Sequence, residues 1–188
     1  MLDKQQILQT LGFDSFTSMQ EEMAKAGSSR GGIVLLSPTG SGKTLGYLLP
    51  AVDRIDVGLD TLQVVVVTPT RELAQQSEEV LKNMKIGIRS LALYGGRPAM
   101  EEHRKIKEVK PQIVFATPGR LNDHLNKENL NARGVSVLII DEFDKCLELG
   151  FQDEMNDLLN HFSNLYGCWL MSATDAEEIP QFMNRLSK

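Results

Sequence analysis

Six short runs of apolar residues recur along the chain, with starts roughly 25 to 30 residues apart, which is about the length of one β-α-β unit. The stretches between them show helical periodicity, as in residues 71–84 and 151–162. Near-continuous runs of Val, Ile and Leu are typical of strands that are buried on both faces of a parallel sheet. The sequence therefore predicts an α/β fold, with a central, mostly parallel sheet and helices on both faces. The runs are residues 33–36, 62–67, 88–93, 112–116, 137–140 and 168–171.

Length and composition favour a single globular domain over residues 1–188. No apolar run approaches the roughly 18 residues of a membrane span, and the first residues contain no unbroken apolar block of a signal peptide. Cys146 and Cys168 stand in apolar surroundings without the spacing of a zinc site, which favours a reducing compartment. We therefore expect a cytoplasmic, monomeric protein that does not associate with membranes.

Polar, glycine-rich or turn-forming residues follow each of the six runs. In open α/β sheets, ligands bind at the carboxyl ends of the strands, so we expect the functional site at this edge of the sheet. The segments are Ser-Pro-Thr-Gly-Ser-Gly-Lys-Thr after residue 36, Thr-Pro-Thr-Arg after residue 67, Tyr-Gly-Gly after residue 93, Thr-Pro-Gly-Arg after residue 116, Asp-Glu-Phe-Asp after residue 140 and Ser-Ala-Thr after residue 171.

The first of these segments has the pattern of a phosphate-binding loop, because it follows a strand and opens a helix. Its glycines let the backbone point successive N–H groups at phosphate oxygens, and the helix adds its positive N-terminal field. We expect Lys43 to reach the β- and γ-phosphates of ATP and the Thr44 hydroxyl to bind Mg²⁺. Ser37 stands where the strict pattern has glycine. The predicted nucleotide-binding residues of this loop are Thr39, Gly40, Ser41, Gly42, Lys43 and Thr44.

Asp141 and Glu142 follow the apolar run at 137–140 and complement the loop. An aspartate at the tip of a buried strand can bind Mg²⁺, usually through water, and the adjacent glutamate can orient or deprotonate the attacking water. The alternative is that the pair is an ordinary acidic start of a helix, stabilised by the helix dipole. The phosphate loop in the same predicted sheet favours the catalytic interpretation.

Taken in order, these motifs resemble the N-terminal RecA-like lobe of DEAD-box ATP-dependent RNA helicases, from residue 12 to residue 174. The resemblance implies a RecA-like lobe that couples ATP hydrolysis to unwinding or remodelling of RNA duplexes. It implies that Phe13 and Gln20 belong to an adenine-reading motif near residues 12–20, and that Ser172 and Thr174 link hydrolysis to duplex separation. The family's second, C-terminal RecA-like lobe is missing from this chain, so we expect the isolated lobe to be nearly inactive.

The resemblance also implies RNA contacts at three segments, for which the residues give independent support. Both Thr-Pro segments precede a predicted helix, whose first N–H groups and neighbouring arginine can bind phosphate without reading bases. The middle third, residues 71–133, carries twelve Lys and Arg against eight Asp and Glu. The alternative is that Thr and Pro only cap helices and that the charges only solvate a surface. The predicted RNA-binding residues are Pro69, Thr70, Arg71, Gly95, Gly96, Arg97, Thr117, Pro118, Gly119 and Arg120.

The sequence also departs from the family pattern. Phe143 replaces the usual alanine, and we expect its ring beside the phosphate loop. In the adenine-reading motif, Phe16 and Ser18 replace two prolines, and Asp3 stands where an aromatic residue is usual. Gln20 could instead be a surface glutamine. Two alternatives to an RNA helicase lobe remain open: a DNA helicase or translocase lobe of the same superfamily, and a nucleotide-dependent RNA-binding scaffold with little turnover.

Other conspicuous residues are assigned structural roles. His103, His124 and His161 lie at unrelated spacings, which favours surface or helix-cap positions over metal ligation. Trp169 and the two cysteines are expected in the core, and Pro50 is expected to kink or end a helix.

Overall fold

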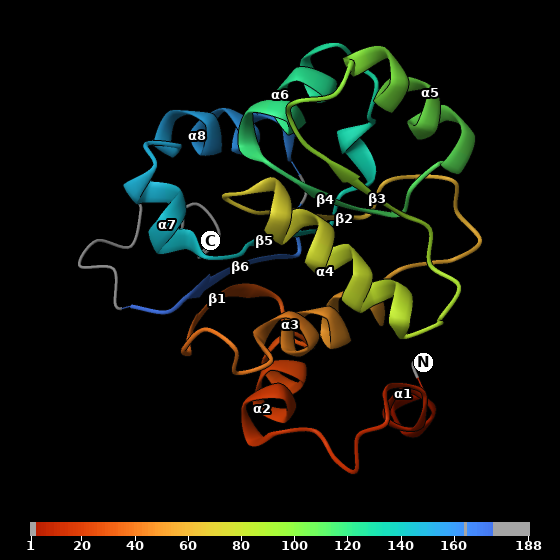
Figure 1. Cartoon of the computed structure of the whole chain (residues 1–188), viewed down its shortest axis with the longest axis vertical. Coiled ribbons are helices and arrows are strands. Elements are labelled where there is room, and N and C mark those ends of the chain that lie inside the picture. The colour runs from red at the N-terminus through yellow and green to blue at the C-terminus, as the bar shows by residue number, and fades with distance from the viewer. Residues whose placement is uncertain (1–2, 164, 175–188) are drawn as a thin grey trace.

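The computed structural model describes residues 3–163 and 165–174, and its centre is one six-stranded sheet with strand order β1-β6-β5-β2-β4-β3 (Figure 1). Every strand pair in this part of the chain is parallel, which confirms the predicted α/β fold. Each predicted apolar run overlaps one strand. The strands are β1 (Gly31–Leu36), β2 (Val64–Val67), β3 (Ser90–Leu93), β4 (Ile113–Ala116), β5 (Val137–Ile140) and β6 (Gly167–Ser172).

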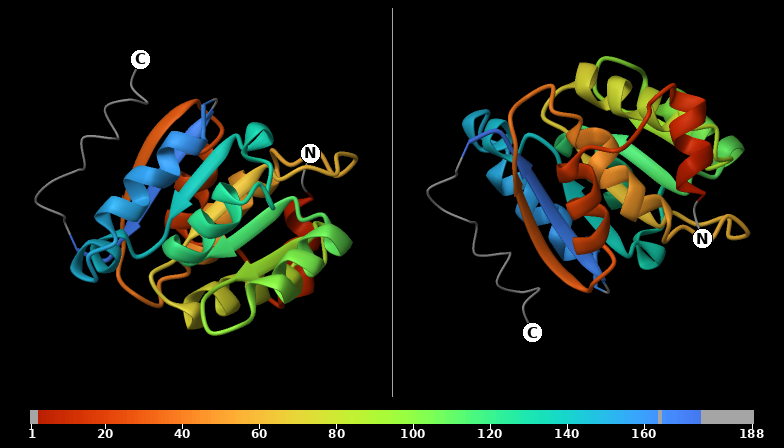
Figure 2. Two further views of the ribbon diagram at one scale, coloured as in Figure 1. Left: turned by 90° about the horizontal axis from the view of Figure 1, so that it is seen from above. Right: turned by 90° about the horizontal axis from the view of Figure 1, so that it is seen from below.

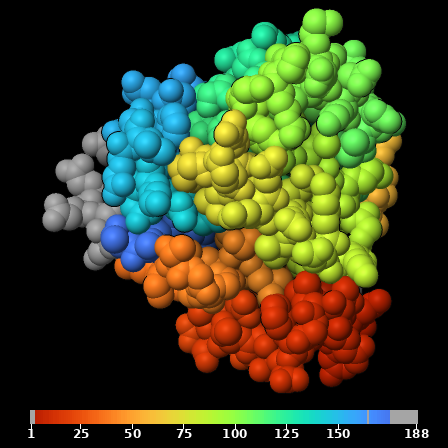
Figure 3. Space-filling model, in the orientation of Figure 1, coloured from red at the N-terminus to blue at the C-terminus, as the bar shows by residue number. Residues whose placement is uncertain are grey.

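Helices connect the strands and cover both faces of the sheet (Figure 2). One face is covered by α3 and α4, and the other by the helices from α5 to α8. Two N-terminal helices, α1 and α2, lie along one side of the molecule, where α2 packs against α3 (Figure 3). The α-helices are α1 (Lys4–Leu11), α2 (Ser18–Ala26), α3 (Lys43–Val52), α4 (Arg71–Asn83), α5 (Ala99–Val109), α6 (Pro118–Asn126), α7 (Phe143–Glu148) and α8 (Gln152–His161), and a short 3-10 helix spans Ala132–Gly134.

Strand β2 shows why the central apolar runs are continuous. Successive side chains of a strand point to opposite faces, and in β2 both faces are buried. Val64 and Val66 belong to the core cluster with α3 and α4, whereas Val65 and Val67 belong to the cluster with the helices from α5 to α8. Trp169, Cys146 and Cys168 are fully buried, as predicted.

Strand β1 lies at one edge of the sheet and is covered on one face only within the described residues. Ile33 and Leu35 pack against the α3 side of the core. Val34 and Leu36 point to the other face and are 43% and 48% exposed. The helices that cover both faces of the sheet therefore leave one face of this edge strand partly exposed among the residues that the structure describes.

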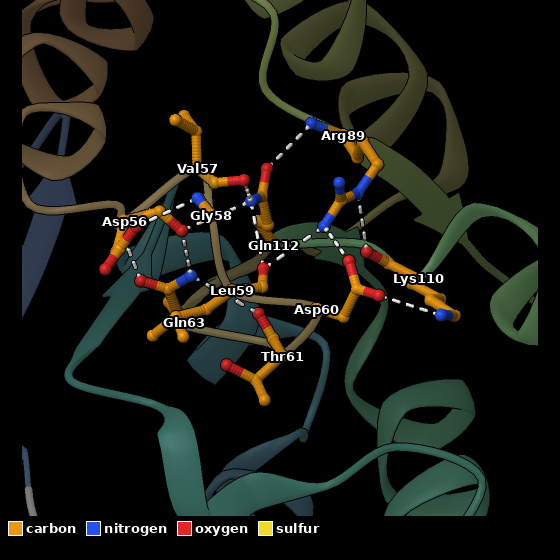
Figure 4. Close-up of polar contacts among 10 residues, drawn as sticks. All are labelled: Asp56, Val57, Gly58, Leu59, Asp60, Thr61, Gln63, Arg89, Lys110 and Gln112. Atoms are coloured by element: carbon orange, nitrogen blue, oxygen red, sulfur yellow. Dashed lines mark hydrogen bonds and ion pairs between the residues drawn. The ribbon is translucent and has the colours of Figure 1, made fainter.

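A polar network closes the amino-terminal edge of the sheet, opposite the predicted site (Figure 4). Gln112 precedes β4, and its side-chain nitrogen lies 2.9–3.2 Å from the carbonyl oxygens of Asp56, Val57 and Leu59. Asp60 is paired with Arg89 at 2.9 Å and with Lys110 at 2.7 Å. The hydrogen bond from Lys110 is the main reason that the pKa of Asp60 is lowered. The network ties the long loop between α3 and β2 to the strand starts.

Pro50 lies inside α3, which ends two residues later at Val52. This position agrees with the prediction that the proline lies near the end of a helix, because a proline inside a helix removes one backbone hydrogen bond.

Candidate functional site

The phosphate-binding loop joins β1 to α3, as predicted. Gly40 and Gly42 have φ values of 80° and 84°, a left-handed conformation that glycine adopts without strain. The residue before α3 is Gly42, and no side chain caps this helix start, so its first N–H groups are free to bind an anion. Ser37, which departs from the strict pattern, donates from its hydroxyl to the Ser41 hydroxyl at 2.7 Å. The serine therefore closes the loop with an extra hydrogen bond.

Lys43 and Asp141 form the buried, charged centre of the site. Lys43 is 7% exposed, and its ammonium donates to the Ser37 carbonyl at 2.5 Å. Asp141 is 2% exposed and accepts hydrogen bonds from the Tyr47 hydroxyl at 3.0 Å and the Glu142 N–H at 2.9 Å. Burial raises the pKa of Asp141 to about 6, although these hydrogen bonds and the charge of Lys43 act against the shift. A carboxylate in this environment is stabilised by a bound cation.

Glu142 has an unusual backbone conformation. Its φ of 47° and ψ of 52° are left-handed, which costs a non-glycine residue on the order of 1 kcal/mol. It immediately precedes α7, yet its side chain makes no capping hydrogen bond to that helix. The Glu142 side chain therefore does not cap α7 by a hydrogen bond, and the strained position next to Asp141 favours a chemical role over an ordinary helix start.

Phe143 does not lie where we predict it from sequence. Its side chain is 2% exposed and belongs to the core cluster on the face covered by the helices from α5 to α8, with Ile140 and Cys146. The phosphate loop leads into α3, which covers the other face. The ring is therefore a core residue, and the predicted position beside the phosphate loop is wrong.

The Ser-Ala-Thr segment connects β6 to both acidic and phosphate-loop residues. Ser172 is 1% exposed, and its hydroxyl donates to the Thr174 carbonyl at 2.6 Å, while its own carbonyl accepts from the Ser37 N–H at 3.0 Å. Thr174 donates to Asp144 from its hydroxyl at 3.0 Å. Burial acts to raise the pKa of Asp144, but the hydrogen bonds from Thr174 and its neighbours outweigh this and lower it. Through the hydrogen bond from Thr174 to Asp144, the segment is in direct contact with α7.

Gln20 is buried against the phosphate loop, so the surface alternative is wrong. It is 6% exposed, its side-chain oxygen accepts from the Thr17 N–H at 3.0 Å, and its nitrogen donates to the Gly42 carbonyl at 3.2 Å. A β-carbon added at Gly42 would lie 2.6 Å from this nitrogen, so residue 42 must be glycine for the contact to form. Phe13, the other predicted adenine-binding residue, is 53% exposed.

The family departures around Gln20 have local explanations. Asp3, at the position of the usual aromatic residue, caps α1 by accepting from the N–H groups of Gln5 and Gln6. Phe16 packs against the α3 side of the core, and Ser18 is the first residue of α2. In this structure these three positions serve helix starts and packing.

The predicted RNA-binding segments lie next to one another. A β-carbon at Gly96 would be 3.8 Å from the Arg71 guanidinium, which places the turn after β3 beside the start of α4. Arg120, on the first turn of α6, donates to the Arg97 carbonyl at 2.8 Å. The guanidinium of Arg97 lies 4.6 Å from the centre of the Tyr94 ring. Three segments that are distant in sequence therefore form one continuous surface.

The members of this surface differ in exposure. Arg71, Gly95, Gly96, Arg97 and Gly119 are exposed, while Thr70, Thr117 and Arg120 are half-buried. Pro69 and Pro118 are buried; Pro69 precedes the N-cap residue of α4, and Pro118 is the first residue of α6. Thr70 caps α4 through the Leu73 N–H at 3.2 Å, whereas the Thr117 side chain makes no capping bond to α6. Of the two threonines, only Thr70 caps its helix, but Pro118 at the first position of α6 also agrees with the capping alternative.

Three site residues escaped the sequence prediction. Tyr47, which binds Asp141, lies four residues after Lys43 on α3, so the helical spacing was a usable signal. No signal in the sequence marked Glu102 or His124 as a site residue. His124 is fully buried and bonded to Glu102 at 2.8 Å, so its predicted surface or cap position is wrong. Glu102 lies in the first turn of α5, where an acidic residue is usually exposed and stabilised by the helix dipole.

The donor set fits Mg²⁺ bound together with a nucleotide. Among the described residues, no group of three or more His, Cys, Asp or Glu could hold a metal by itself. Mg²⁺ typically takes one or two protein oxygens and completes its shell with water and phosphate oxygens. Asp141 and Thr44 match this pattern. None of the helices in the described part of the chain has the length and apolarity needed to cross a membrane.

Comparisons with known proteins agree with the geometry. Residues 17–182 match the family described as DEAD/DEAH box helicase. The chain is 33% identical over 184 residues to the DEAD-box ATP-dependent RNA helicase CshA of Bacillus cereus, covering 96% of this chain and 34% of that protein. It is 34% identical over 177 residues to the ATP-dependent RNA helicase CshA of Listeria monocytogenes, covering 93% of this chain and 34% of that protein. The chain thus spans about a third of the curated relatives that it matches.

Two solved structures have the same fold. A DEAD box protein from Methanococcus jannaschii aligns with a TM-score of 0.83 at 27% identity, covering 96% of this chain and 49% of that one. A hypothetical ATP-dependent RNA helicase from Sulfolobus tokodaii aligns with a TM-score of 0.80 at 30% identity, covering 98% of this chain and 54% of that one.

Proposed function

Because the chain belongs to the DEAD/DEAH box helicase family, we propose that it is the ATP- and RNA-binding lobe of an ATP-dependent RNA helicase. The observation that carries this proposal is the arrangement of Lys43, Asp141 and Glu142 beside a glycine-rich loop that leads into an uncapped helix start. Such a site can bind a triphosphate and position a water for attack on it.

In this proposal, the backbone N–H groups of the loop and of the first turn of α3 bind the phosphates. Lys43 exchanges its contact with the Ser37 carbonyl for phosphate oxygens. Thr44 and Asp141 would hold Mg²⁺, which would neutralise negative charge on the phosphates. Glu142 orients the attacking water and accepts its proton.

In the proposed complex, Gln20 contacts both the adenine base of the nucleotide and the phosphate-binding loop. Its side-chain oxygen and one N–H are already bound to Thr17 and Gly42, which leaves the second N–H for an acceptor on adenine. Phe13 offers an exposed ring for the base.

The route from hydrolysis to RNA runs through the Ser-Ala-Thr segment. Ser172 contacts the start of the phosphate loop, and Thr174 contacts Asp144 on α7. A change at the phosphates can therefore move α7 and the end of β6 together.

RNA crosses the surface formed by Arg71, the turn at Gly95–Arg97 and Arg120, bound through its backbone. A second RecA-like lobe, supplied by the rest of the protein, completes both sites. We further propose that the protein works as a monomer in the cytoplasm; its two buried cysteines without a disulfide support a reducing compartment.

The test is ATP binding and RNA-stimulated hydrolysis by the full-length protein. Lys43→Ala should weaken ATP binding, because a charge-assisted contact is lost, while Lys127→Ala, at an exposed lysine, should not. Glu142→Gln should keep ATP affinity and lower turnover by about 10² to 10⁴. Equal ATP affinity with and without Lys43 would refute the site.

The choice of nucleic acid is tested by competition. Backbone recognition of RNA depends on its 2′-hydroxyls, so DNA of the same sequence should compete poorly. Equal competition by DNA would favour the DNA translocase alternative. Binding of RNA without nucleotide turnover in the full-length protein would favour the scaffold alternative.

A further inference from the structure

Glu102 is a buried carboxylate at the centre of the predicted RNA surface. It lies on the first turn of α5, and its side chain is 4% exposed. A buried acid requires compensating partners, because transfer of a lone charge out of water is costly. The partners of Glu102 come from two segments that lie apart in sequence: Tyr94 in the turn after β3, and Arg120 and His124 on α6.

The first oxygen of Glu102 binds the glycine turn. Its Oε1 accepts from the backbone N–H of Tyr94 at 3.1 Å, immediately before Gly95 and Gly96. The Tyr94 hydroxyl is bonded to Gln75 on α4 at 2.5 Å. Tyr94 is thus held at its backbone by α5 and at its ring by α4, and the glycines that follow begin from a fixed point.

The second oxygen of Glu102 faces Arg120. Its Oε2 lies 3.5 Å from the Nε of Arg120, whose side chain is 14% exposed. The Nη2 of the same guanidinium donates to the Arg97 carbonyl at 2.8 Å. Because a guanidinium has five N–H donors in a rigid plane, fixing Nε and Nη2 also fixes the direction of the remaining donors.

His124 completes the cluster. The Asn129 amide nitrogen lies 3.0 Å from Nδ1 of His124 and donates to it, so the ring proton is on Nε2, which donates to Oε2 of Glu102 at 2.8 Å. A neutral imidazole therefore satisfies both contacts.

We propose that Glu102 is the positioning residue of the RNA surface, which aligns the Gly95–Arg97 turn and the Arg120 guanidinium for the phosphate backbone without touching RNA itself. This inference rests on the proposed function, because it requires RNA to cross this surface. It assigns to α5 a role that exposed residues alone do not reveal.

The experiment measures RNA affinity, ATP affinity and turnover in the full-length protein with single-stranded RNA as the probe. Glu102→Ala should weaken RNA binding about five- to tenfold, as expected for a residue that acts on a site through its neighbours. ATP affinity and turnover at saturating RNA should stay within about twofold of wild type, because the phosphate loop is untouched. A general loss of stability would change all three quantities or none. Glu101→Ala, at the exposed neighbouring position, is the control.

Glu102→Gln keeps the shape and an oxygen for the Tyr94 N–H, so it tests the proposal even where alanine impairs folding. It should recover part of the RNA affinity, and the remaining loss should disappear in an Arg120→Ala background, since both changes act through one guanidinium. RNA affinity within twofold of wild type for both Glu102 variants, with Arg120→Ala weakening binding, would overturn the positioning role alone. If Arg71→Ala and Arg120→Ala also left RNA affinity unchanged, the RNA surface and the positioning role would both be overturned.

Discussion

At the scale of single residues, the site combines groups that are costly to bury. Asp141 is almost completely buried, and burial raises its pKa to about 6. Lys43 and the Tyr47 hydroxyl compensate part of this cost. Preorganised charges of this kind are typical of sites that stabilise a charged ligand, and they reduce the stability of the empty protein.

The pH dependence of stability tests this interpretation. Because the folded-state pKa of Asp141 lies above its unfolded value, its contribution is present below about pH 4 and is lost as the pH rises through about 6. Asp141→Asn lacks this titration. Without nucleotide, denaturant unfolding should therefore show the variant gaining about 2 kcal/mol relative to wild type between pH 4.5 and pH 7.5. A difference that did not change with pH would contradict the assignment.

At the scale of elements, the two edges of the sheet have different roles. The carboxyl ends of the strands lead into the candidate site, whereas the amino ends are closed by the Gln112 network. Gln112 is fully buried and stands at the start of β4, where its amide replaces water for three loop carbonyls. The network anchors the loop that precedes β2 and keeps β2 in register.

We expect Gln112→Ala to destabilise the chain by about 1 to 3 kcal/mol, because buried carbonyls lose their donor. ATP affinity should be unchanged, because the network and the phosphate loop lie at opposite edges of the sheet. Denaturant unfolding and ATP titration of the same variant measure both effects. Asp60→Ala, which removes only exposed ion pairs, is a matched change and should cost less. If Gln112→Ala changed the free energy of ATP binding by more than the free energy of unfolding, the separate roles of the two sheet edges would be contradicted.

At the scale of the whole molecule, the proposed function makes the chain one part of a composite site. It spans about a third of its curated relatives, and its acidic segment and its proposed phosphate- and RNA-binding segments all follow strands at one edge of one sheet. Charge that develops on the transferred phosphoryl group needs cationic groups in place before the reaction, and in the proposed mechanism the second lobe supplies them.

The isolated chain should therefore hydrolyse ATP about 10³- to 10⁵-fold more slowly than the full-length protein, the range attributed to an arginine supplied from outside the nucleotide-binding lobe. It should also fail to separate RNA duplexes. Steady-state hydrolysis and strand-displacement assays with both proteins check these expectations. Duplex separation by the isolated chain at the full-length rate would show that no second lobe is needed.

The sequence by itself determined the α/β class, the strand positions and the phosphate loop, because these depend on local patterns: apolar runs, helical periodicity and glycines at fixed offsets. The helix predicted at residues 71–84 ends one residue earlier, and that at 151–162 starts one residue later and ends one earlier. Such differences are ordinary, since helix ends fray.

Tertiary structure alone decided which polar residues are buried together. Glu102 and His124 meet only because α5 and α6 pack side by side on the sheet, and neither residue differs in sequence from a solvated helix residue. Gln20 reaches Gly42 because α2 packs against α3, and Phe143 enters the core because α7 turns back over β5 and β6. Contacts between residues that are distant in sequence produce no recognisable sequence pattern. The propensities that determine strands and turns, in contrast, act over a few neighbouring residues.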